Sequence, residues 1–216
     1  MSEARHQILQ RLRRVERPSG DELTRSTDRH PWNRQEKIER FTARMSEVRA
    51  EVHTTTQGTW AADLVNILQA KGVRNIVYSP DKPEGRQLTT AVTAANIDSV
   101  PYDQTIEAWK GELFQRMDAG FTGCRGAIAE TGSLILWPDE AEPRLLSLVP
   151  PIHCVLLQAD DIYSTFAEAI KAQDWTEEGM PTNALLISGP SKSADIAQVL
   201  AYGVHGPKSL LVMVVQ

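Results

Sequence analysis

The last apolar run of the chain, residues 209–215, leaves few folds open to this sequence. Its letters, SLLVMVV, are apolar at both odd and even positions. Because successive side chains of a strand point to opposite faces, such a run is typical of a central strand that is buried on both sides. A strand of this kind needs a covering layer on each face, and helices supply that layer in α/β proteins. The run therefore predicts an α/β fold.

Upstream of this run, helical and strand-like segments alternate along the chain. Apolar residues three and four positions apart predict amphipathic helices, and short apolar runs between turn residues predict strands. A strand, a helix and a second strand in succession are typical of a crossover connection between parallel strands. We expect helices at residues 38–52, 59–71, 85–95 and 106–117, with strands at 73–78, around 99–100 and from about 121.

The middle of the chain carries further apolar runs in quick succession. They lie at residues 133–137, 144–148 and 153–157. Their connections are too short for crossover helices, which predicts antiparallel pairing in this part. A helix opening at Asp160 or Asp161 and a buried strand at 184–187 are expected next. The predicted architecture is an α/β fold with a mixed, mainly parallel sheet and flanking helices.

The N-terminal part differs from the rest. Residues 2–14 have apolar positions at helical spacing beneath a basic face, and residues 17–31 are polar and without periodicity. We therefore expect an N-terminal helix and linker over residues 1–33 and one α/β domain over residues 34–216. The first residues do not form the apolar core of a secretory signal, and no apolar run is long enough to span a membrane. These patterns predict a cytoplasmic protein.

Composition disfavours several classes of site. The 216 residues carry a net charge of -5, which gives no general attraction to nucleic acid. Cys124 and Cys154 lie far apart and form no local zinc or cluster motif, so we interpret both as buried thiols, with a disulfide as the alternative. The phosphate-loop, dinucleotide-binding and His-Glu-x-x-His motifs are absent from the sequence. No metal or cofactor is expected from these patterns.

A serine-rich loop after the predicted strand at 184–187 is the first candidate site. Its hydroxyls, its lysine and the free N–H groups of a helix starting at Ser193 are suited to holding a phosphate or a carboxylate. Its glycine and proline allow the chain to turn closely around a ligand. The alternative is a well-capped turn without a ligand. The predicted ligand-binding residues are Ser188, Gly189, Ser191, Lys192, Ser193 and Asp195.

The turn at residues 130–133 is the second candidate site. Glu130 is suited to act as a base or as a nucleophilic carboxylate that forms an acyl intermediate. Thr131, Gly132 and Ser133 are predicted to bind a ligand beside it. The alternative is that Glu130 caps a turn or forms a salt bridge near a sheet edge, while the hydroxyls only close the turn.

Two histidines and one arginine complete the candidates. His205 lies between glycines just before the last apolar run, and we expect its ring to point toward the ligand-binding end of the sheet as a candidate catalytic residue. A structural hydrogen bond to a carbonyl is the alternative for His205. His153, inside a strand pattern, is interpreted as structural. Arg144 is either a carboxylate clamp or an exposed residue at the start of a strand.

Four sequence blocks, in this order, resemble the lactate-utilisation protein C family, also called the LUD domain. They are Ala129–Ser133, Arg144–Pro150 with His153, Ser188–Ile196 and Gly203–Pro207. The resemblance covers roughly residues 35–216 and is strongest after Gly126. One departure is Ala197, which stands where the family commonly has an acidic residue, so this chain lacks a carboxylate at that position.

The resemblance implies a fold like that of the sugar-phosphate isomerase and CoA-transferase superfamily. It also implies a role in a bacterial complex that oxidises L-lactate to pyruvate, with the iron–sulphur centres on companion subunits. We therefore expect a subunit without its own redox centre that binds a small carboxylate or phosphate. A CoA-transferase-like enzyme that uses Glu130 and a non-catalytic module that binds an anionic metabolite are the alternatives. Whether the chain itself is catalytic is left open.

Overall fold

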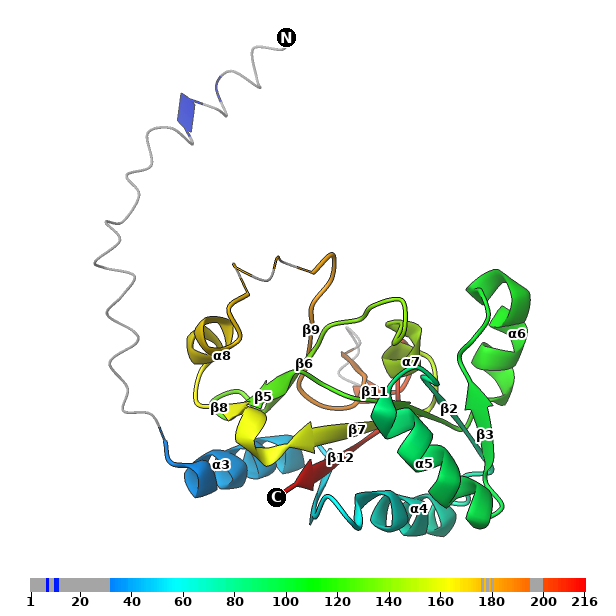
Figure 1. Cartoon of the computed structure of the whole chain (residues 1–216). Coiled ribbons are helices and arrows are strands. Elements are labelled where there is room, and N and C mark those ends of the chain that lie inside the picture. The colour runs from blue at the N-terminus through cyan, green and yellow to red at the C-terminus, as the bar shows by residue number, and fades with distance from the viewer. Residues whose placement is uncertain are drawn as a thin grey trace. The chain divides into compact units, whose positions relative to one another are not determined.

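A six-stranded sheet forms the centre of the α/β unit, which comprises residues 32–216 (Figure 1). Every neighbouring pair of its strands is parallel. This computed structural model describes residues 7, 10, 11, 32–175, 177, 179, 181–194 and 200–216. The strand order is β1 (Glu51–Thr55), β12 (Ser209–Val215), β7 (Ile152–Gln158), β4 (Ala119–Thr122), β2 (Asn75–Tyr78) and β3 (Asp98–Pro101).

The last apolar run lies where its two-sided pattern predicts. As β12, it pairs with β1 on one side and with β7 on the other, and its residues from Leu210 to Val215 are buried. Leu211 and Met213 pack into the core on one face, whereas Leu210, Val212 and Val214 pack into the core on the other. The predicted α/β fold with a mainly parallel sheet is thereby confirmed.

Two helices cover the first face of this sheet. They are α4 (Trp60–Ala70) and α5 (Pro83–Ala94), whose apolar stripes contact strand residues in one core cluster. The ring of Trp60 stacks on Phe121 of β4 with centroids 5.5 Å apart. The predicted end of α4 at Gly72 agrees with the structure, because this glycine has a φ of 70°.

The opposite face is covered by α3 (Arg34–Glu47) and a four-stranded sheet. A capping box at Asn33 and Glu36 fixes the start of α3, and the helix buries its own side chains Phe41 and Met45. The small sheet has the order β8 (Ile162–Tyr163), β5 (Gly126–Ile128), β6 (Ser133–Leu136) and β9 (Leu185–Ile187). Its β5–β6 and β6–β9 pairs are antiparallel, as expected for the run that begins at residue 133. The same expectation is wrong for residues 153–157, which lie in β7 and pair parallel with β4 and β12 because they belong to the six-stranded sheet.

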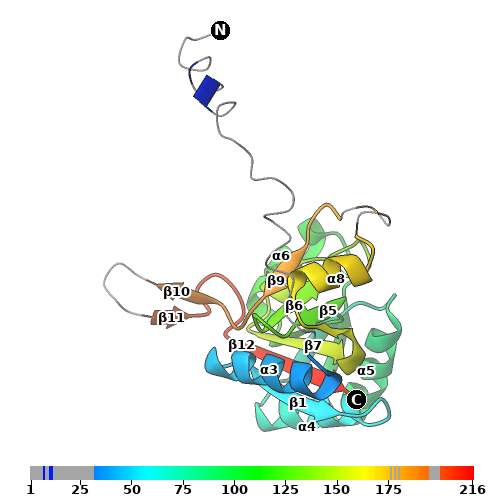
Figure 2. The same ribbon diagram turned by 90° about the vertical axis from the view of Figure 1, so that its left-hand side faces the viewer.

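Three further helices complete the layers. α6 (Ile106–Arg116) and the short α7 (Leu145–Leu148) share a core cluster with Val77 of β2. α8 (Phe166–Ala172) covers the outer face of the small sheet, where Ala169 joins Ile128 and Ile135. Figure 2 shows α8, the four-stranded sheet, the six-stranded sheet and α4 as successive layers.

Two further predictions in the middle of the chain are wrong. Residues 145–148 form α7 instead of a strand, because α7 packs tightly on β4 at Gly120, where an added Cβ would lie 2.3 Å from the Leu146 carbonyl oxygen. No helix begins at Asp160 or Asp161, because a 3₁₀ turn at Ala159–Asp161 leads into β8, which pairs with β5. The helix starts later, at Phe166, where the Thr165 side chain caps it.

The serine-rich loop also leads into a different element from the one expected. Lys192–Ala194 form strand β10, which pairs antiparallel with β11 (Leu200–Tyr202), so no helix starts at Ser193. Figure 2 shows this hairpin extending away from the six-stranded sheet. Strand β9 before the loop is present but not buried, because it pairs only with β6 and leaves Leu186 48% exposed.

The N-terminal prediction concerns residues that lie mostly outside the described ones. Gln7, Gln10 and Arg11 are helical and exposed. The boundary between residues 33 and 34 stays a prediction. Within the described parts of the chain, no helix is long and apolar enough to cross a membrane.

Candidate functional site

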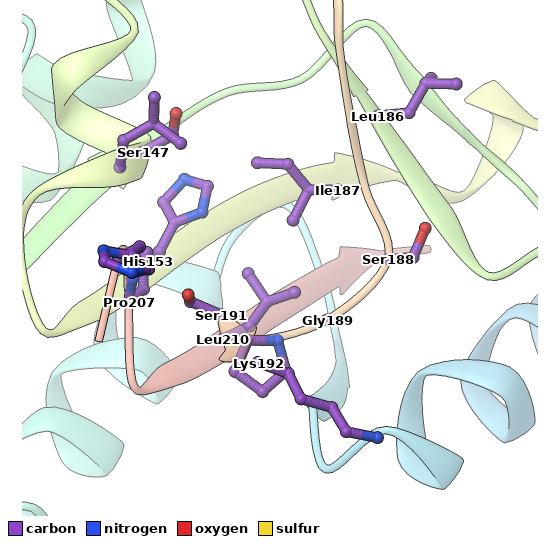
Figure 3. A pocket seen from close by; sticks show the side chains of 14 residues that line it. Ser147, His153, Leu186, Ile187, Ser188, Gly189, Ser191, Lys192, Pro207 and Leu210 are labelled. Atoms are coloured by element: carbon purple, nitrogen blue, oxygen red, sulfur yellow. The ribbon is translucent and has the colours of Figure 1, made fainter. Parts of the chain in front are cut away.

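A pocket of about 420 Å³ lies at the amino edge of the six-stranded sheet, where β7 and β12 begin (Figure 3). Four segments that are distant in sequence meet there, namely the end of α7, the start of β7, the loop after β9 and the loop before β12. We call it the amino-edge pocket. Its lining residues are Ser147, Leu148, His153, Leu186, Ile187, Ser188, Gly189, Pro190, Ser191, Lys192, His205, Gly206, Pro207 and Leu210.

Backbone hydrogen bonds hold the serine-rich loop against the loop before β12. The Ser191 N–H donates to the Pro207 carbonyl at 2.8 Å, and the Gly203 N–H donates to the Ser191 carbonyl at 2.9 Å. Gly189 has a φ of 138°, and an added Cβ there would lie 2.7 Å from a methyl carbon of Val48. The loop therefore needs a glycine at this position to turn beside the end of α3.

A chain of hydroxyl groups joins the second candidate site to this loop. The Thr131 and Ser133 hydroxyls are 2.8 Å apart, and the Ser133 and Ser188 hydroxyls are 2.7 Å apart. Ser133 is 4% exposed, so its hydroxyl exchanges little with solvent and depends on these partners. The structure thus brings together Thr131, Ser133 and Ser188, three of the residues that the sequence singled out.

Glu130 and Gly132 have a different setting. The Glu130 N–H donates to the Ser164 carbonyl at 3.1 Å, which ties the turn to the residue after β8. Gly132 has a φ of 63°, and an added Cβ would lie 2.4 Å from the Cβ of Arg44 in α3. Neither residue is among the described residues that line the amino-edge pocket. The catalytic role of Glu130 and the ligand contact of Gly132 stay predictions.

The remaining residues of the serine-rich loop differ in their placement. Lys192 is exposed, and Figure 3 shows its side chain pointing away from His153. Ser193 lies in β10 opposite Ala201 and is not among the described lining residues. Asp195 lies outside the described residues. Because the chain continues from Ser191 into a strand, the expected helix N-terminus does not contribute N–H groups to an anion site here.

His205 is exposed and lines the pocket, so it lies at the amino edge of the sheet. It precedes β12, and the residue before a parallel strand lies at the amino edge. Ligands of open α/β sheets usually bind at the carboxyl edge. His205 therefore belongs to the amino-edge pocket through its loop, while a catalytic role stays a prediction. Arg144, the possible carboxylate clamp, is an exposed residue that precedes α7.

His153 is the residue whose role the sequence underestimated. It is the second residue of β7, only 1% exposed, and it lines the pocket. Its Nε2 atom lies 2.9 Å from the Thr122 hydroxyl, whereas its Nδ1 atom has no hydrogen-bond partner among the described residues. Burial lowers the pKa of His153 to about 3, so the ring is neutral at neutral pH.

Apolar side chains form much of the wall. Leu210 is 1% exposed, and Leu148, Leu186 and Ile187 complete the apolar part. Among the described lining residues there is no carboxyl group, and Lys192 supplies a positive charge. The pocket is therefore suited to a ligand that combines an apolar part with oxygen atoms, and its charge favours an anion over a cation.

A second pocket, of about 560 Å³, lies at the carboxyl edge of the same sheet. It lies beyond the ends of the neighbouring strands β2 and β4. Because β2 leads to β3 on one side and β4 leads toward β7 on the other, this is a switch point of the sheet. Lys82 and Asp139 form a salt bridge of 2.8 Å, and the Gly123 N–H donates to Glu142 at 2.9 Å. Desolvation raises the pKa of Glu142.

This second pocket contains no residue that the sequence analysis proposed as a site residue. The signal available in the sequence was the pair of segments that directly follow the predicted strands β2 and β4. Ligands of open α/β sheets bind beyond the ends of two neighbouring strands whose connections run in opposite directions. Strand order, however, depends on long-range pairing that no local motif specifies.

The family model described as the LUD domain matches residues 38–215. The chain belongs to the LUD domain family. The resemblance of the four sequence blocks is thereby confirmed. Membership of the wider sugar-phosphate isomerase and CoA-transferase superfamily stays a prediction.

Two relatives and one solved structure are similar to this LUD domain. It is 36% identical over 217 residues to an uncharacterized protein of Neisseria meningitidis serogroup B, covering 98% of the chain and 93% of the relative. It is 33% identical over 113 residues to lactate utilization protein C of Macrococcus caseolyticus, an alignment that covers 51% of the chain and 49% of that relative. This second alignment thus spans about half the length of either protein.

The solved structure supports the fold over a longer range. It is a crystal structure of a DUF162 family protein from Deinococcus radiodurans, with a TM-score of 0.63 and 27% sequence identity. The match covers 86% of the LUD domain chain and 100% of the crystallised chain. The arrangement of helices and strands is therefore similar in the two proteins.

Proposed function

We propose that this LUD domain protein takes part in lactate utilisation and binds a small carboxylic acid in the amino-edge pocket. The role in lactate utilisation is supported by relatives that carry the name lactate utilization protein C, such as those of Macrococcus caseolyticus and Deinococcus radiodurans. In the finer form of the proposal, the protein is a cytoplasmic subunit of a complex that oxidises L-lactate to pyruvate. The iron–sulphur centres of that complex lie on companion subunits.

The observation that carries the proposal is the convergence of the predicted loop residues on one pocket. Ser188, Gly189, Ser191, Lys192 and His205 were singled out from two separate sequence blocks, and all of them line the amino-edge pocket. Hydroxyl, amide and imidazole groups are the usual partners of carboxylate oxygens. Their meeting at one pocket supports a small acid as the ligand.

The two alternatives receive less support. A CoA-transferase-like reaction requires the Glu130 carboxylate to face bound substrate, and Glu130 lines neither the amino-edge nor the carboxyl-edge pocket as far as the described residues show. Trapping of a hydroxylamine-sensitive thioester at Glu130 with an acyl-CoA would revive that alternative. A module that binds an anionic metabolite without chemistry uses the same pocket. It differs from the proposed function because the bound acid is released unchanged.

Gene deletion tests the proposed role. A strain that lacks the gene but keeps the companion genes should fail to grow on L-lactate and should grow normally on pyruvate, which lies beyond the oxidation step. Reintroducing the wild-type gene should restore growth. Normal growth of the deletion strain on L-lactate would refute the role.

A matched pair of variants connects this role with the pocket. Ser191→Ala removes a hydroxyl of the amino-edge pocket but keeps the two backbone hydrogen bonds of the residue. Ser99→Ala removes a hydroxyl from the edge strand β3, on the far side of the sheet. Growth on L-lactate should be slower with the Ser191 variant than with the Ser99 variant. Equal growth would separate the lactate role from this pocket.

A further inference from the structure

The unpaired ring nitrogen of His153 is the starting point. The side chain is 1% exposed, and the Thr122 hydroxyl, 2.9 Å away, satisfies only Nε2. Nδ1 is buried and has no partner among the described residues. Figure 3 shows the ring between Ser147 and Ile187, on the wall of the amino-edge pocket. A buried polar atom without a partner is unfavourable, and a ligand oxygen in the pocket would satisfy it.

The charge of the ring restricts what that oxygen is. Burial keeps His153 neutral at neutral pH, so the ring offers a hydrogen bond but no positive charge. A carboxylate placed against it would lose its hydration without gaining a cation. A hydroxyl or a carbonyl oxygen has a smaller desolvation cost and is the better partner for Nδ1.

The carboxylate of the ligand belongs at the solvent side of the pocket. Lys192 and His205 line the pocket and are exposed. Ser191 also lines the pocket and is half-buried. A carboxylate there keeps part of its hydration and lies near the cationic side chain. The buried Leu210 and the neighbouring Ile187 then contact the carbon chain of the ligand.

Thr122 allows His153 to serve two kinds of oxygen. A hydroxyl group both donates and accepts, so Thr122 can donate to Nε2 or accept a hydrogen bond from it. In the first case Nδ1 carries the hydrogen and donates to a carbonyl oxygen. In the second case Nδ1 accepts from a hydroxyl group. The same pair of residues therefore suits a hydroxy acid and the corresponding oxo acid.

We infer that the amino-edge pocket binds a short hydroxy- or oxo-carboxylic acid, with its uncharged oxygen at Nδ1 of His153 and its carboxylate at the solvent side. This inference rests on the proposed function and names the recognition contact within it. Thr122 is a positioning residue, because it acts on the ligand through the His153 ring.

Matched ligands test the contact. Isothermal titration of the full chain is carried out with L-lactate, pyruvate and propionate, which share a carboxylate and a three-carbon chain. Propionate lacks the oxygen at the second carbon. L-lactate and pyruvate should bind roughly threefold to tenfold more tightly than propionate, the difference expected for one hydrogen bond. Equal affinities for the three acids, or binding of none, would overturn the inference.

Variants assign the difference to His153. His153→Leu should retain the affinity for propionate and lose the preference for L-lactate and pyruvate, while Ser99→Ala should behave as wild type. Thr122→Val should reduce the preference, because the ring is no longer held at Nε2. A preference that survives in a folded His153→Leu variant would overturn the inference. Should that variant fail to fold, the comparison of the three acids on the wild-type chain remains decisive.

This experiment and the gene deletion have independent outcomes. Loss of growth on L-lactate together with equal affinities for the three acids would keep the proposed role and remove the recognition contact. Normal growth together with a preference that depends on His153 would remove the role and keep the contact.

Discussion

The Nε2 atom of His153 and the hydroxyl of Thr122, 2.9 Å apart, join two neighbouring strands beneath the amino-edge pocket. Both side chains are buried, at 1% and 2% exposure. The pair fixes the plane of the imidazole and leaves Nδ1 as the polar atom without a partner among the described residues. An unpaired polar atom thus belongs to a residue that lines the pocket, together with the apolar side chains of Ile187 and Leu210.

Burial of His153 predicts a loss of stability in mild acid. The pKa is about 3 in the folded chain, against a usual value of 6.5. Because the folded pKa is the lower one, the unfolded chain takes up a proton that the folded chain excludes as the pH falls below 6.5. The free energy of unfolding should therefore drop by about 2 kcal/mol between pH 7 and pH 5 from this residue alone.

Urea unfolding at both pH values measures this effect. His153→Asn has no ring to protonate, so its stability should fall less between pH 7 and pH 5 than that of the wild type. The comparison cancels the contributions of all other titrating groups. Equal losses for the two proteins would show that His153 is not buried as described.

Gly120 is predicted to be intolerant of substitution. An added Cβ would lie 2.3 Å from the Leu146 carbonyl oxygen and 2.9 Å from the ring of Pro150. Gly120→Ala should therefore push α7 away from β4 and cost about 1–3 kcal/mol of stability, as overpacking usually does. The matched control is Gly111→Ala, at a position in α6 where no atom lies within 4 Å of an added Cβ. Thermal unfolding of the two variants compares them, and equal melting temperatures would contradict the tight contact.

Both cysteines are predicted to react slowly with thiol reagents in the native protein. They are free thiols, and burial raises the pKa of Cys124 and of Cys154 to about 12, so little thiolate forms at neutral pH. The buried-thiol interpretation is confirmed for Cys154, which is 0% exposed, whereas Cys124 is half-buried and lines the carboxyl-edge pocket. Titration with a chromogenic disulfide reagent should show two reactive groups in denaturant and slow reaction without it. Rapid labelling of Cys124 in the native chain would contradict its described setting.

Glu142 in the carboxyl-edge pocket is predicted to lower stability at neutral pH. Its folded pKa is raised by desolvation, so the ionised form is disfavoured in the folded chain once the pH rises through that pKa. Glu142→Gln should therefore be more stable than the wild type at pH 7, while its amide oxygen still accepts from the Gly123 N–H. The gain should shrink at pH 4, where the wild-type carboxyl group is largely protonated. A gain that is independent of pH would exclude desolvation of the carboxylate as its cause.

Local patterns predicted the elements whose own apolar side chains indicate which faces are buried. The two-sided run at residues 209–215 specified β12, and helical spacing specified α4 to α6 and most of α3. The predicted end of α3 at residue 52 is wrong, because the helix ends at Glu47 and Val52 lies in β1. In contrast, β1 was missed because Glu51–Thr55 are mostly polar, and pairing with β12 makes them a strand. α7 was misread because its apolar letters fit a strand, whereas its packing on Gly120 decides the conformation.

The candidate site likewise contains residues that local patterns predicted and residues that they did not. Ser188, Gly189, Ser191 and His205 were predictable, because small and polar residues at turns are visible in the sequence. The pocket environment of His153 was not, since it depends on contacts with β4 and on loops more than thirty residues away. The expected helix at Ser193 failed because a serine before apolar residues also suits a hairpin strand.

Binding of L-lactate beside His153 is tested by the side-chain nitrogen spectrum of the histidines, recorded by NMR with and without L-lactate. His53, which lies in β1 and is not a described lining residue of the pocket, serves as the internal reference. If the acid binds in the amino-edge pocket, the ring resonances of His153 should shift as L-lactate is added, while those of His53 stay in place. Unchanged His153 resonances at L-lactate concentrations that raise the melting temperature would show that L-lactate does not bind in the amino-edge pocket.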